Sequence, residues 1–426
     1  MRRVYDSMMP TASFHAESLL RAQHEAFAHC ESARRAAKVQ KDRGIGGMVP
    51  KPEIQWIPWG STAEIVGVFD RVETEYSAIR SGAALCDQPQ RGTIEVTGAQ
   101  RIAFLQSMCT QDLNGLAAGQ SRRSFLLNRK GRIDADLLLC ELGDRLLIDC
   151  AGASAESTAK ALTKFVFSEE VTLTDVSSRD YRMALHGPEA LHLLALTGAS
   201  EQAVECLGQA GSCLATTIAG VLCVLVRADV CGTTGIEIFV ARDQAIALWS
   251  ALLGVHDLLD GGKRRARPCG WQAFNIARIE GGSPLFEIDF STTSLPHETG
   301  ILAKRVSFKK GCYLGQEIVA RMESLGKPKQ MLCAFRMESN ALPNSGAQMF
   351  APTAEGGTSD AVGVVTSSAM SPMLGATCIG FASIRYAFTA AETALLVSAE
   401  GLPARAIVQA ELGSLPEAPS SKDRPQ

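Results

Sequence analysis

Apolar and polar residues alternate in patterns that predict regular secondary structure from residue 56 onward. Apolar residues recur at helical spacing over residues 72–84 and 99–109, which predicts two amphipathic helices. Strict alternation between two glycines predicts a half-buried strand over residues 92–98. Further strands are expected at residues 124–128, 133–141 and 145–150.

The next block of the chain repeats this order of helices and strands. They alternate there without the strict strand–helix–strand rhythm of a parallel sheet, which favours an α+β fold with antiparallel sheets backed by helices. The elements expected in this block are helices at 156–167, from Pro188 onward and at 244–253, and strands at 171–175, 181–186, 221–226 and 236–240.

A change of composition after residue 329 marks a C-terminal part without a convincing helix. Strand-like segments there are separated by Gly, Ser and Pro turns, which is typical of a small β-barrel. The predicted parts are an unstructured or loosely helical extension (1–50), an α+β region of two lobes (51–330), a β-barrel (331–412) and a disordered tail (413–426).

Composition excludes several classes of protein. The 426 residues are 46% apolar and 20% charged with a net charge of −3, which is typical of a soluble globular chain. The sequence has no basic stripe, so direct nucleic-acid binding is not expected. The longest apolar run, residues 218–226, is far shorter than the roughly 20 residues of a spanning helix, so no membrane partner is expected.

The thirteen cysteines are scattered and form no C-x-x-C pair. Zinc sites, iron–sulfur clusters and disulfide frameworks need clustered cysteines, so no metal site or disulfide is expected. Most of these cysteines lie in apolar runs, which is typical of buried thiols in a reducing compartment and predicts a cytoplasmic location.

One segment carries candidate chemistry, residues 306–321, with the sequence VSFKKGCYLGQEIVAR. Cys312 precedes an expected helix that starts near Leu314, and it follows Lys309 and Lys310. A helix N-terminus and neighbouring ammonium groups both lower the pKa of a thiol, which makes Cys312 a candidate reactive cysteine. A structural thiol in a turn is the alternative interpretation.

The same segment resembles a known family. The stretch KGCYLGQE at residues 310–317 is similar to the K-G-C-Y-x-G-Q-E box of YgfZ-type folate-binding proteins. These belong to the superfamily of the glycine-cleavage aminomethyltransferase, the T-protein. The resemblance continues through residues 127–136 (LNRKGRIDAD) and 277–284 (ARIEGGSP), and it covers roughly residues 60–390.

The resemblance implies three lobes around a central channel that binds tetrahydrofolate or another reduced folate. A pterin edge presents adjacent N–H donors that a carboxylate accepts, for which Asp136 and Glu280 are candidates. The glutamate tail requires cations, and the aromatic ring requires apolar walls. The residues expected to bind the cofactor are Arg227, Arg278, Glu280, Tyr313, Gln316, Glu317 and Arg321, and those expected in catalysis are Cys312, Lys310 and Asp136.

Two of these assignments have plainer alternatives. Asp136 is also consistent with a residue that caps a strand. Arg278 and Glu280 lie two positions apart and cannot share a helix face, which favours a surface position for one of them.

The sequence departs from the aminomethyltransferases at residues 227–237 (RADVCGTTGIE), which match their R-x-G-Y-T-G-E-x-G-x-E box. Val230 stands in place of the tyrosine, and Thr233 in place of the glutamate that holds the pterin. A hydroxyl group cannot replace a bidentate carboxylate, and the loss of a charge-assisted hydrogen bond costs about 1.5–3 kcal/mol. Asp229 is a candidate for the missing carboxylate.

Three functions follow from these observations. The expected one is a YgfZ-like, tetrahydrofolate-binding accessory protein that supports iron–sulfur cluster assembly or repair, and through it tRNA modification. Its partners would be iron–sulfur assembly or client proteins, and Lys310 would hold the working thiol of Cys312 ionised. The alternative is an aminomethyltransferase of one-carbon metabolism, in which Asp136 orients or deprotonates the folate amine. The third is a folate-binding scaffold without turnover.

Overall fold

A computed structural model describes residues 18–26, 28, 54–60, 63–254, 265–352 and 358–413 of the chain. The predicted N-terminal extension at 1–50 falls within this description only at residues 18–26 and 28, and the predicted tail at 413–426 only at residue 413. The remainder of both segments lies outside the described residues.

The chain divides into two compact units and passes between them more than once. The first unit consists of Met1–Asp229, Thr233–Asn275 and Ser291–Lys327. The second consists of Val230–Gly232, Ile276–Phe290 and Pro328–Gln426. Two short segments from the middle of the sequence therefore belong with the C-terminal unit.

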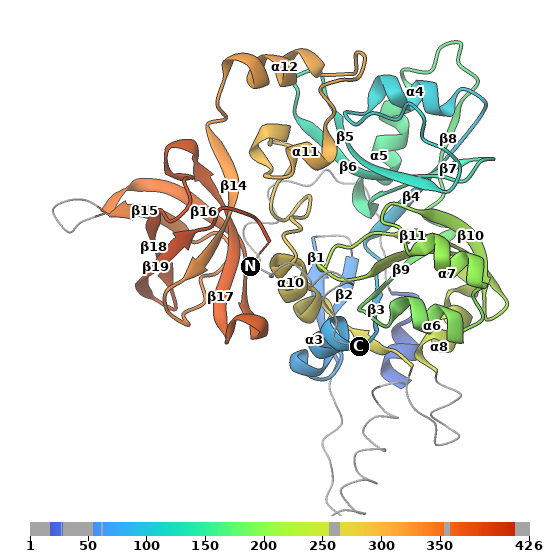
Figure 1. Ribbon diagram of the computed structural model, residues 1–426, viewed down its shortest axis with the longest axis horizontal. Helices are drawn as coiled ribbons and strands as arrows, with labels where there is room; N and C mark the ends of the chain where they lie inside the picture. The colour runs from blue at the N-terminus through green and yellow to red at the C-terminus, as the bar shows by residue number, and fades with distance from the viewer. Residues whose placement is uncertain are drawn as a thin grey trace, which may run out of the picture. The chain divides into compact units, whose positions relative to one another are not determined.

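A five-stranded antiparallel sheet forms one part of the first unit (Figure 1). Its strands, in spatial order, are β5 (Gln120–Leu127), β6 (Ile133–Glu141), β7 (Leu146–Ala151), β4 (Arg91–Thr97) and β8 (Thr172–Asp175). The helices α4 (Arg101–Met108) and α5 (Gly152–Thr163) pack on one face of it. Alternate residues of the strands, such as Leu137 and Ile148, form a core with Leu105 of α4 and Leu162 of α5.

The second sheet of this unit has the spatial order β10 (Cys213–Ile218), β11 (Val221–Arg227), β12 (Gly235–Ala241), β9 (Asp180–His186), β3 (Ala84–Asp87) and β13 (Arg267–Cys269). Its neighbours are antiparallel, except that β3 and β13 run parallel. The same unit contains helices α3 (Val72–Ser81), α6 (Ala190–Leu196), α7 (Glu201–Leu207) and α8 (Ala245–Leu253), and the strand pair β1 (Gln55–Trp59) and β2 (Ala63–Val68). Leu193 of α6 and Trp249 of α8 are buried in its core.

Residues 18–26, within the predicted extension, pack onto this core. A helical turn spans residues 21–26, and Leu20 and His24 are fully buried. Nε2 of His24 lies 2.8 Å from Oδ2 of Asp87, which is 63 positions away in the chain. The local sequence pattern does not show this burial, because the contacts that produce it are distant in sequence.

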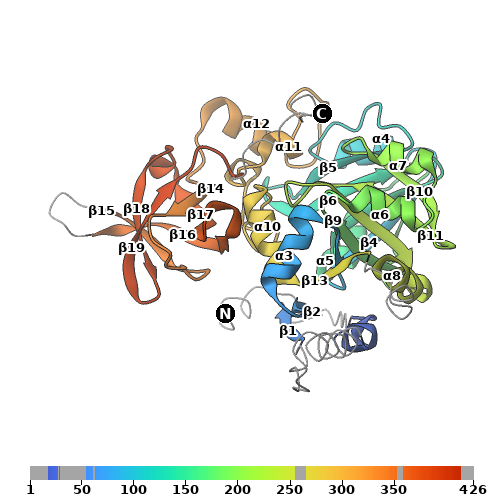
Figure 2. The ribbon, with the colours of Figure 1, turned by 60° about the horizontal axis from the view of Figure 1, so that its bottom comes forward.

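The second unit contains a closed β-barrel (Figure 2). Its strands, in spatial order, are β14 (Gln330–Met337), β17 (Thr377–Arg385), β16 (Thr358–Ser371), β15 (Gln348–Pro352), β18 (Ala394–Ala399) and β19 (Leu402–Val408). Phe335, Met349 and Leu395 lie in its interior. The predicted α+β fold with antiparallel sheets and a C-terminal β-barrel is confirmed.

The remaining helical segments are α10 (Trp271–Glu280), α11 (Leu302–Arg305), α12 (Gln316–Leu325) and the 3₁₀ turns η1 (Arg242–Gln244), η2 (Pro296–Glu298), η3 (Pro372–Leu374) and η4 (Tyr386–Phe388). Sequence patterns did not predict β10, because this edge strand, CLATTI, carries few strongly apolar residues. Within the described parts of the chain, no helix is long and apolar enough to cross a membrane.

Candidate functional site

The two large sheets of the first unit pack against each other, each through one face (Figures 1 and 2). Part of this interface is apolar and includes Leu138 of β6 and Phe239 of β12. Residues directly opposite each other on antiparallel strands point to the same face. By this register, Arg123 and Asp149 lie on either side of Leu138, on the face that meets the other sheet. On the opposing sheet, Arg182 lies beside Phe239. Charged residues thus border the apolar contact.

Arg182 joins the two sheets through a buried ion-pair network. Its guanidinium group donates to Oδ1 of Asp149 at 2.8 Å and to Oε2 of Glu237 at 3.1 Å, and its side chain is only 1% exposed. Arg91 donates two further hydrogen bonds to Asp149, at 2.7 and 3.0 Å. The guanidinium carbon of Arg182 lies 3.5 Å from the centroid of the Phe239 ring. These buried charges therefore compensate one another, as their desolvation requires.

Burial and ion pairing act in opposite directions on the two carboxylates of this network. Burial would raise the pKa of Asp149, but Arg182 and Arg91 outweigh it and hold that pKa below its usual value. For Glu237 burial prevails and its pKa is raised, although Arg182 opposes the rise. Asp149 therefore carries the more firmly fixed negative charge.

Asp136 lies in the interior of β6, on the same face, opposite Phe125 of β5. Arg305, at the end of α11, donates to its Oδ1 at 2.7 Å and to its Oδ2 at 3.3 Å. The side chains of Asp136 and Arg305 are 11% and 10% exposed. The alternative in which Asp136 caps a strand end is wrong, because a bidentate arginine holds it from the side in mid-strand.

Arg123 is a further cation in this charged layer, and it is half-buried. Within the described residues, no hydrogen bond or ion pair joins its guanidinium group to another side chain or to the main chain. Burial, and then the charge of Arg305, lower the pKa of Arg123, while the carboxylates of Asp136, Glu237 and Asp149 oppose this shift. Arg123 thus differs from the other arginines of the layer, which all have carboxylate partners.

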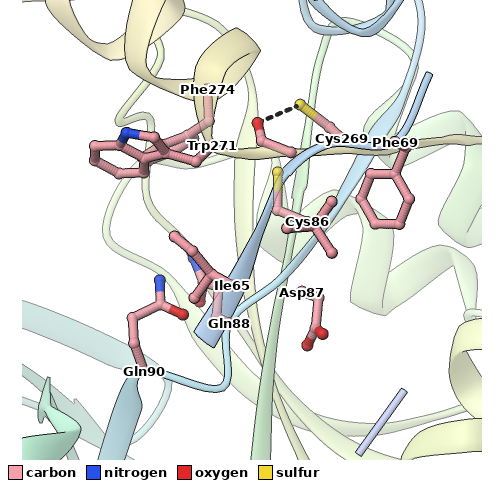
Figure 3. Close-up of a pocket in the computed structure, with 11 residues that line it drawn as sticks. Ile65, Phe69, Cys86, Asp87, Gln88, Gln90, Cys269, Trp271 and Phe274 are labelled. Carbon is pink, nitrogen blue, oxygen red and sulfur yellow. Dashed lines mark hydrogen bonds between the residues drawn. The ribbon is translucent and has the colours of Figure 1, made fainter. Parts of the chain in front are cut away.

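A pocket opens between β2, β3 and the start of α10 (Figure 3). Its empty space, counted out to the surrounding solvent, is about 370 Å³. The apolar part of its wall includes Ile65, Phe69, Trp271 and Phe274. The Oε1 atoms of Gln88 and Gln90 are buried and, among the described residues, have no hydrogen-bond partner. Buried acceptors of this kind require a donor from water or from a ligand, and Gln90 directly precedes Arg91 of the ion-pair network.

His186 is fully buried at the end of β9, on the same face as Arg182. Neither ring nitrogen has a hydrogen-bond partner among the described residues, and the ring centroid lies 5.5 Å from that of Phe274. Burial lowers the pKa of His186 to about 4, so the ring is neutral at neutral pH.

We expect His186 to make the protein less stable as the pH falls from about 6.5 to about 4. An unperturbed histidine ring has a pKa of 6.5, and the pKa of this ring is about 4 in the folded protein, so the unfolded chain binds more protons in this window. The contribution of His186 to the free energy of unfolding is complete above pH 6.5. It decreases by about 3 kcal/mol as the pH is lowered to about 4. Urea unfolding at several pH values should show that the free energy of unfolding depends less on pH in His186→Gln than in the wild type. The exposed control His192→Gln should follow the wild type; identical profiles for all three proteins would contradict this assignment.

Lys310 points away from solvent and holds the loop that follows α4. Its Nζ donates to the main-chain oxygens of Gln106, Cys109 and Gln111 at 2.6, 2.5 and 3.1 Å. Burial lowers the pKa of Lys310, although the neighbouring groups of Cys109 and Asp112 oppose this. This ammonium group therefore stabilises the loop after α4, and its role in ionising Cys312 stays a prediction.

Cys312 is exposed and lies four residues before the first residue of α12, not directly at the helix start. Gly315 precedes the helix with φ of 80°, a left-handed conformation. A Cβ atom there would come within 2.5 Å of the main-chain oxygen of Asn128. Glycine is thus required at this position of the box because only glycine fits both the φ angle and the close approach.

The other residues of the box form the turn into α12. Oε1 of Gln316 accepts a hydrogen bond from the main-chain N–H of Tyr313 at 3.2 Å. The ring of Tyr313 is buried, with Nζ of Lys310 5.1 Å from its centroid. Glu317 and Arg321 are exposed on α12. Tyr313 and Gln316 therefore stabilise the turn, and the roles of these four residues in cofactor binding stay predictions.

Arg227, at the end of β11, is paired with Asp229. Its Nε and Nη2 donate to the Asp229 carboxylate at 2.5 and 3.1 Å. Oδ1 of Asp229 also accepts from the N–H of Gly235 at 2.9 Å. Asp229, the candidate replacement for the carboxylate absent at Thr233, is therefore already engaged in the connection between β11 and β12.

Arg278 and Glu280 belong to the second unit. Arg278 is fully buried and donates to Oδ2 of Asp289 at 2.7 Å and to Oγ of Ser367 at 2.6 Å. Glu280 is also fully buried and accepts a hydrogen bond from Ser371 of β16. The expectation that one of the two lies on the surface is wrong, because each finds a polar partner inside its unit.

Sequence reasoning did not select six residues that the structure places in the charged layer. They are Arg91, Arg123, Asp149, Arg182, Glu237 and Arg305. A signal was present for two of them: Arg182 in YRMALH (residues 181–186) and Glu237 in GIEIFVA are single charges at inward positions of apolar strands. Charged residues are rarely buried without partners, so this pattern indicates a buried ion pair.

Comparison with known proteins identifies the family of this chain. The family model described as "GCVT N-terminal domain" matches residues 52–310, which is more than half of the sequence. The chain belongs to the GcvT family. The broader part of the predicted resemblance, to the aminomethyltransferase superfamily, is thereby confirmed.

Individual members of the GcvT family agree with this assignment. The chain is 31% identical over 306 residues to an aminomethyltransferase of Streptomyces coelicolor, covering 71% of this chain and 78% of the relative. It is 28% identical over 335 residues to an aminomethyltransferase of Geobacillus sp. (strain WCH70), covering 78% and 87%. The crystal structure of glycine cleavage system aminomethyltransferase T from Bartonella henselae matches with a TM-score of 0.72 at 22% identity, covering 84% of this chain and 93% of that one. At this identity the likeness shows a shared fold.

These comparisons correct one prediction about this GcvT-family chain. The predicted main function, an accessory protein for iron–sulfur cluster assembly or repair and for tRNA modification, is wrong, because the curated relatives are named aminomethyltransferase. That prediction depended on the eight residues at 310–317, whereas the match to the aminomethyltransferases extends over more than 300 residues. The iron–sulfur partners were inferred from the same function and are not supported.

Proposed function

We propose that this protein is a folate-dependent aminomethyltransferase. It transfers the one-carbon unit of an aminomethyl group, carried on a lipoyl arm, to tetrahydrofolate and releases ammonia. Tetrahydrofolate is the one-carbon acceptor of the GcvT family. The observation that carries the proposal is the Asp136 carboxylate, which Arg305 holds on the charged inward face of β6.

Residues of the first unit offer chemical groups that a reduced folate requires. A pterin edge presents N–H donors, and the buried Oε1 atoms of Gln88 and Gln90 are acceptors without a partner among the described residues. The rings of Trp271 and Phe274 offer apolar surface beside them (Figure 3). Since Thr233 supplies no carboxylate, these amides and Asp136 are candidate acceptors for the pterin.

Bound tetrahydrofolate supplies the nucleophilic nitrogen of the reaction. Oδ2 of Asp136 is the atom available to accept a proton, because its bond to Arg305 is 3.3 Å long while Oδ1 is bound at 2.7 Å. Arg305 orients the carboxylate. The buried network around Arg182 fixes the two sheets relative to each other, so the face that carries Asp136 is rigid.

A reconstituted reaction tests this proposal. The full chain is incubated with tetrahydrofolate and a lipoylated carrier protein loaded with aminomethyl groups. Ammonia and methylene-tetrahydrofolate should form in equal amounts, and neither should form when the folate or the carrier is left out. A folded protein that binds tetrahydrofolate but forms neither product would overturn the proposal and favour a scaffold without turnover.

Finer assignments stay predictions beside this proposal. Resemblance to the YgfZ-type proteins depends on the box at residues 310–317, and the assignment of Cys312 to catalysis depends on it as well. The cytoplasmic location likewise stays a prediction from the cysteine pattern of the sequence.

A further inference from the structure

We infer that Arg123 binds a carboxylate group of the substrate at the interface of the two sheets. This inference rests on the proposed function, because it assigns one end of the substrate to Arg123 while Asp136 serves the reacting end. Three observations support it: the lack of a carboxylate partner for Arg123, its partial exposure and its register relative to Asp136.

Arg123 makes no hydrogen bond to any of the three carboxylates around it. Arg91, Arg123, Arg182 and Arg305 face the carboxylates of Asp136, Asp149 and Glu237. Three of the arginines donate hydrogen bonds to these carboxylates, and Arg123 is the one that does not. A partly buried charge without an ion-pair partner destabilises the folded protein until an opposite charge binds to it.

Arg123 is accessible to such a counter-charge. Its side chain is half-buried, in contrast to the fully buried Arg182. A guanidinium group presents a planar fork of N–H donors that matches a carboxylate with two parallel hydrogen bonds. A carboxylate that reaches the exposed part of this group can therefore accept two hydrogen bonds from it.

The register places this group near the reacting end of the substrate. Arg123 pairs with Leu138, and Phe125 pairs with Asp136, so Arg123 and Asp136 are diagonal neighbours on one face of β5 and β6. Such neighbours lie about 7–8 Å apart at their Cα atoms. A substrate of ordinary size can contact both residues at once, with its carboxylate at Arg123.

The adjacent arginine provides a matched control for the test. Arg122 is exposed and lies on the opposite face of β5, and among the described residues it donates only to the main-chain oxygen of Ser121. We expect Arg123→Met to raise the melting temperature of the ligand-free protein, because the unmatched charge is removed. It should also weaken acetate binding, measured by calorimetry, about 10- to 100-fold. Arg122→Met should change neither quantity.

The inference is overturned if Arg123→Met binds acetate as tightly as the wild type, or if Arg122→Met loses as much affinity. Arg123→Lys keeps the positive charge but loses the planar pair of N–H donors of the guanidinium group. Its affinity for acetate should lie between those of the wild type and Arg123→Met. Should Arg123→Met fail to fold, equal acetate binding by Arg123→Lys and the wild type overturns the inference instead.

Two probes distinguish the sources of the carboxylate. If it belongs to the glutamate tail of the folate, Arg123→Met weakens tetrahydrofolate binding about 10- to 100-fold and leaves the binding of 6-methyltetrahydropterin, which has no carboxylate, unchanged. If the carboxylate belongs to the one-carbon donor, Arg123→Met binds tetrahydrofolate and 6-methyltetrahydropterin as tightly as the wild type does, while its affinity for acetate falls. A wild-type protein that shows Arg123-dependent acetate binding but no aminomethyl transfer would refute the proposed function and leave the anion site standing.

Discussion

Asp136→Asn should lower the rate of aminomethyl transfer about 100-fold or more. An amide has nearly the shape of a carboxylate but cannot accept the proton, and positioned acid–base groups contribute about 10²- to 10⁴-fold to rates. The substitution also leaves Arg305 without its charged partner, which should reduce the free energy of unfolding by about 1–3 kcal/mol. Initial rates of methylene-tetrahydrofolate formation therefore have to be measured well below the melting temperature of the variant.

A surface aspartate of the same sheet is the control for this measurement. Asp144 lies in the turn that follows β6, and its side chain is 68% exposed. Asp144→Asn should retain the wild-type rate. If folded Asp136→Asn also transfers at a rate within about threefold of the wild type, Asp136 is not the proton acceptor, and the proposed mechanism loses its central residue.

Arg182→Met should reduce the free energy of unfolding by about 3–5 kcal/mol, the largest loss of stability that we expect from a single substitution in this chain. The change leaves the buried carboxylates of Asp149 and Glu237 without the cation that bridges them. It also removes the guanidinium group that lies 3.5 Å from the Phe239 ring centroid. Urea unfolding at neutral pH measures the loss directly.

Arg179 offers a control of the same residue type in the same sheet region. It pairs with Glu95 and Asp180, but its side chain is 56% exposed. Because exposed ion pairs contribute little, Arg179→Met should cost less than about 1 kcal/mol. Similar losses for Arg179→Met and Arg182→Met would show that the network across the two sheets does not stabilise them.

Local patterns were sufficient for most elements of the fold. The alternation of apolar residues over 133–141 predicted β6, and the helical spacing over 99–109 predicted α4, which spans Arg101–Met108. These elements form because one face of each is apolar, and that property is written in consecutive residues. The edge strand β10 was missed because it buries little apolar surface and so leaves a weak pattern.

Local reasoning was less successful for the side chains of the candidate site. Lys310 is two residues from Cys312 in the sequence, but its ammonium group donates to main-chain oxygens about 200 residues away. A lysine side chain is long enough to reach away from its sequence neighbours, so proximity in the sequence did not predict its partner.

The sequence by itself determined most of the strands and helices, the C-terminal barrel and the aminomethyltransferase superfamily, and it placed Asp136 in a motif of that superfamily. Only the tertiary structure decided which charges meet: Arg305 pairs with Asp136 across 169 residues, and Arg182 with Glu237 across 55. The physical reason is that strand periodicity fixes the face on which a residue lies, whereas the packing of a second sheet decides what lies opposite. Arg123 illustrates this limit, since its missing partner becomes evident only when every neighbouring carboxylate is seen to be bound by another arginine.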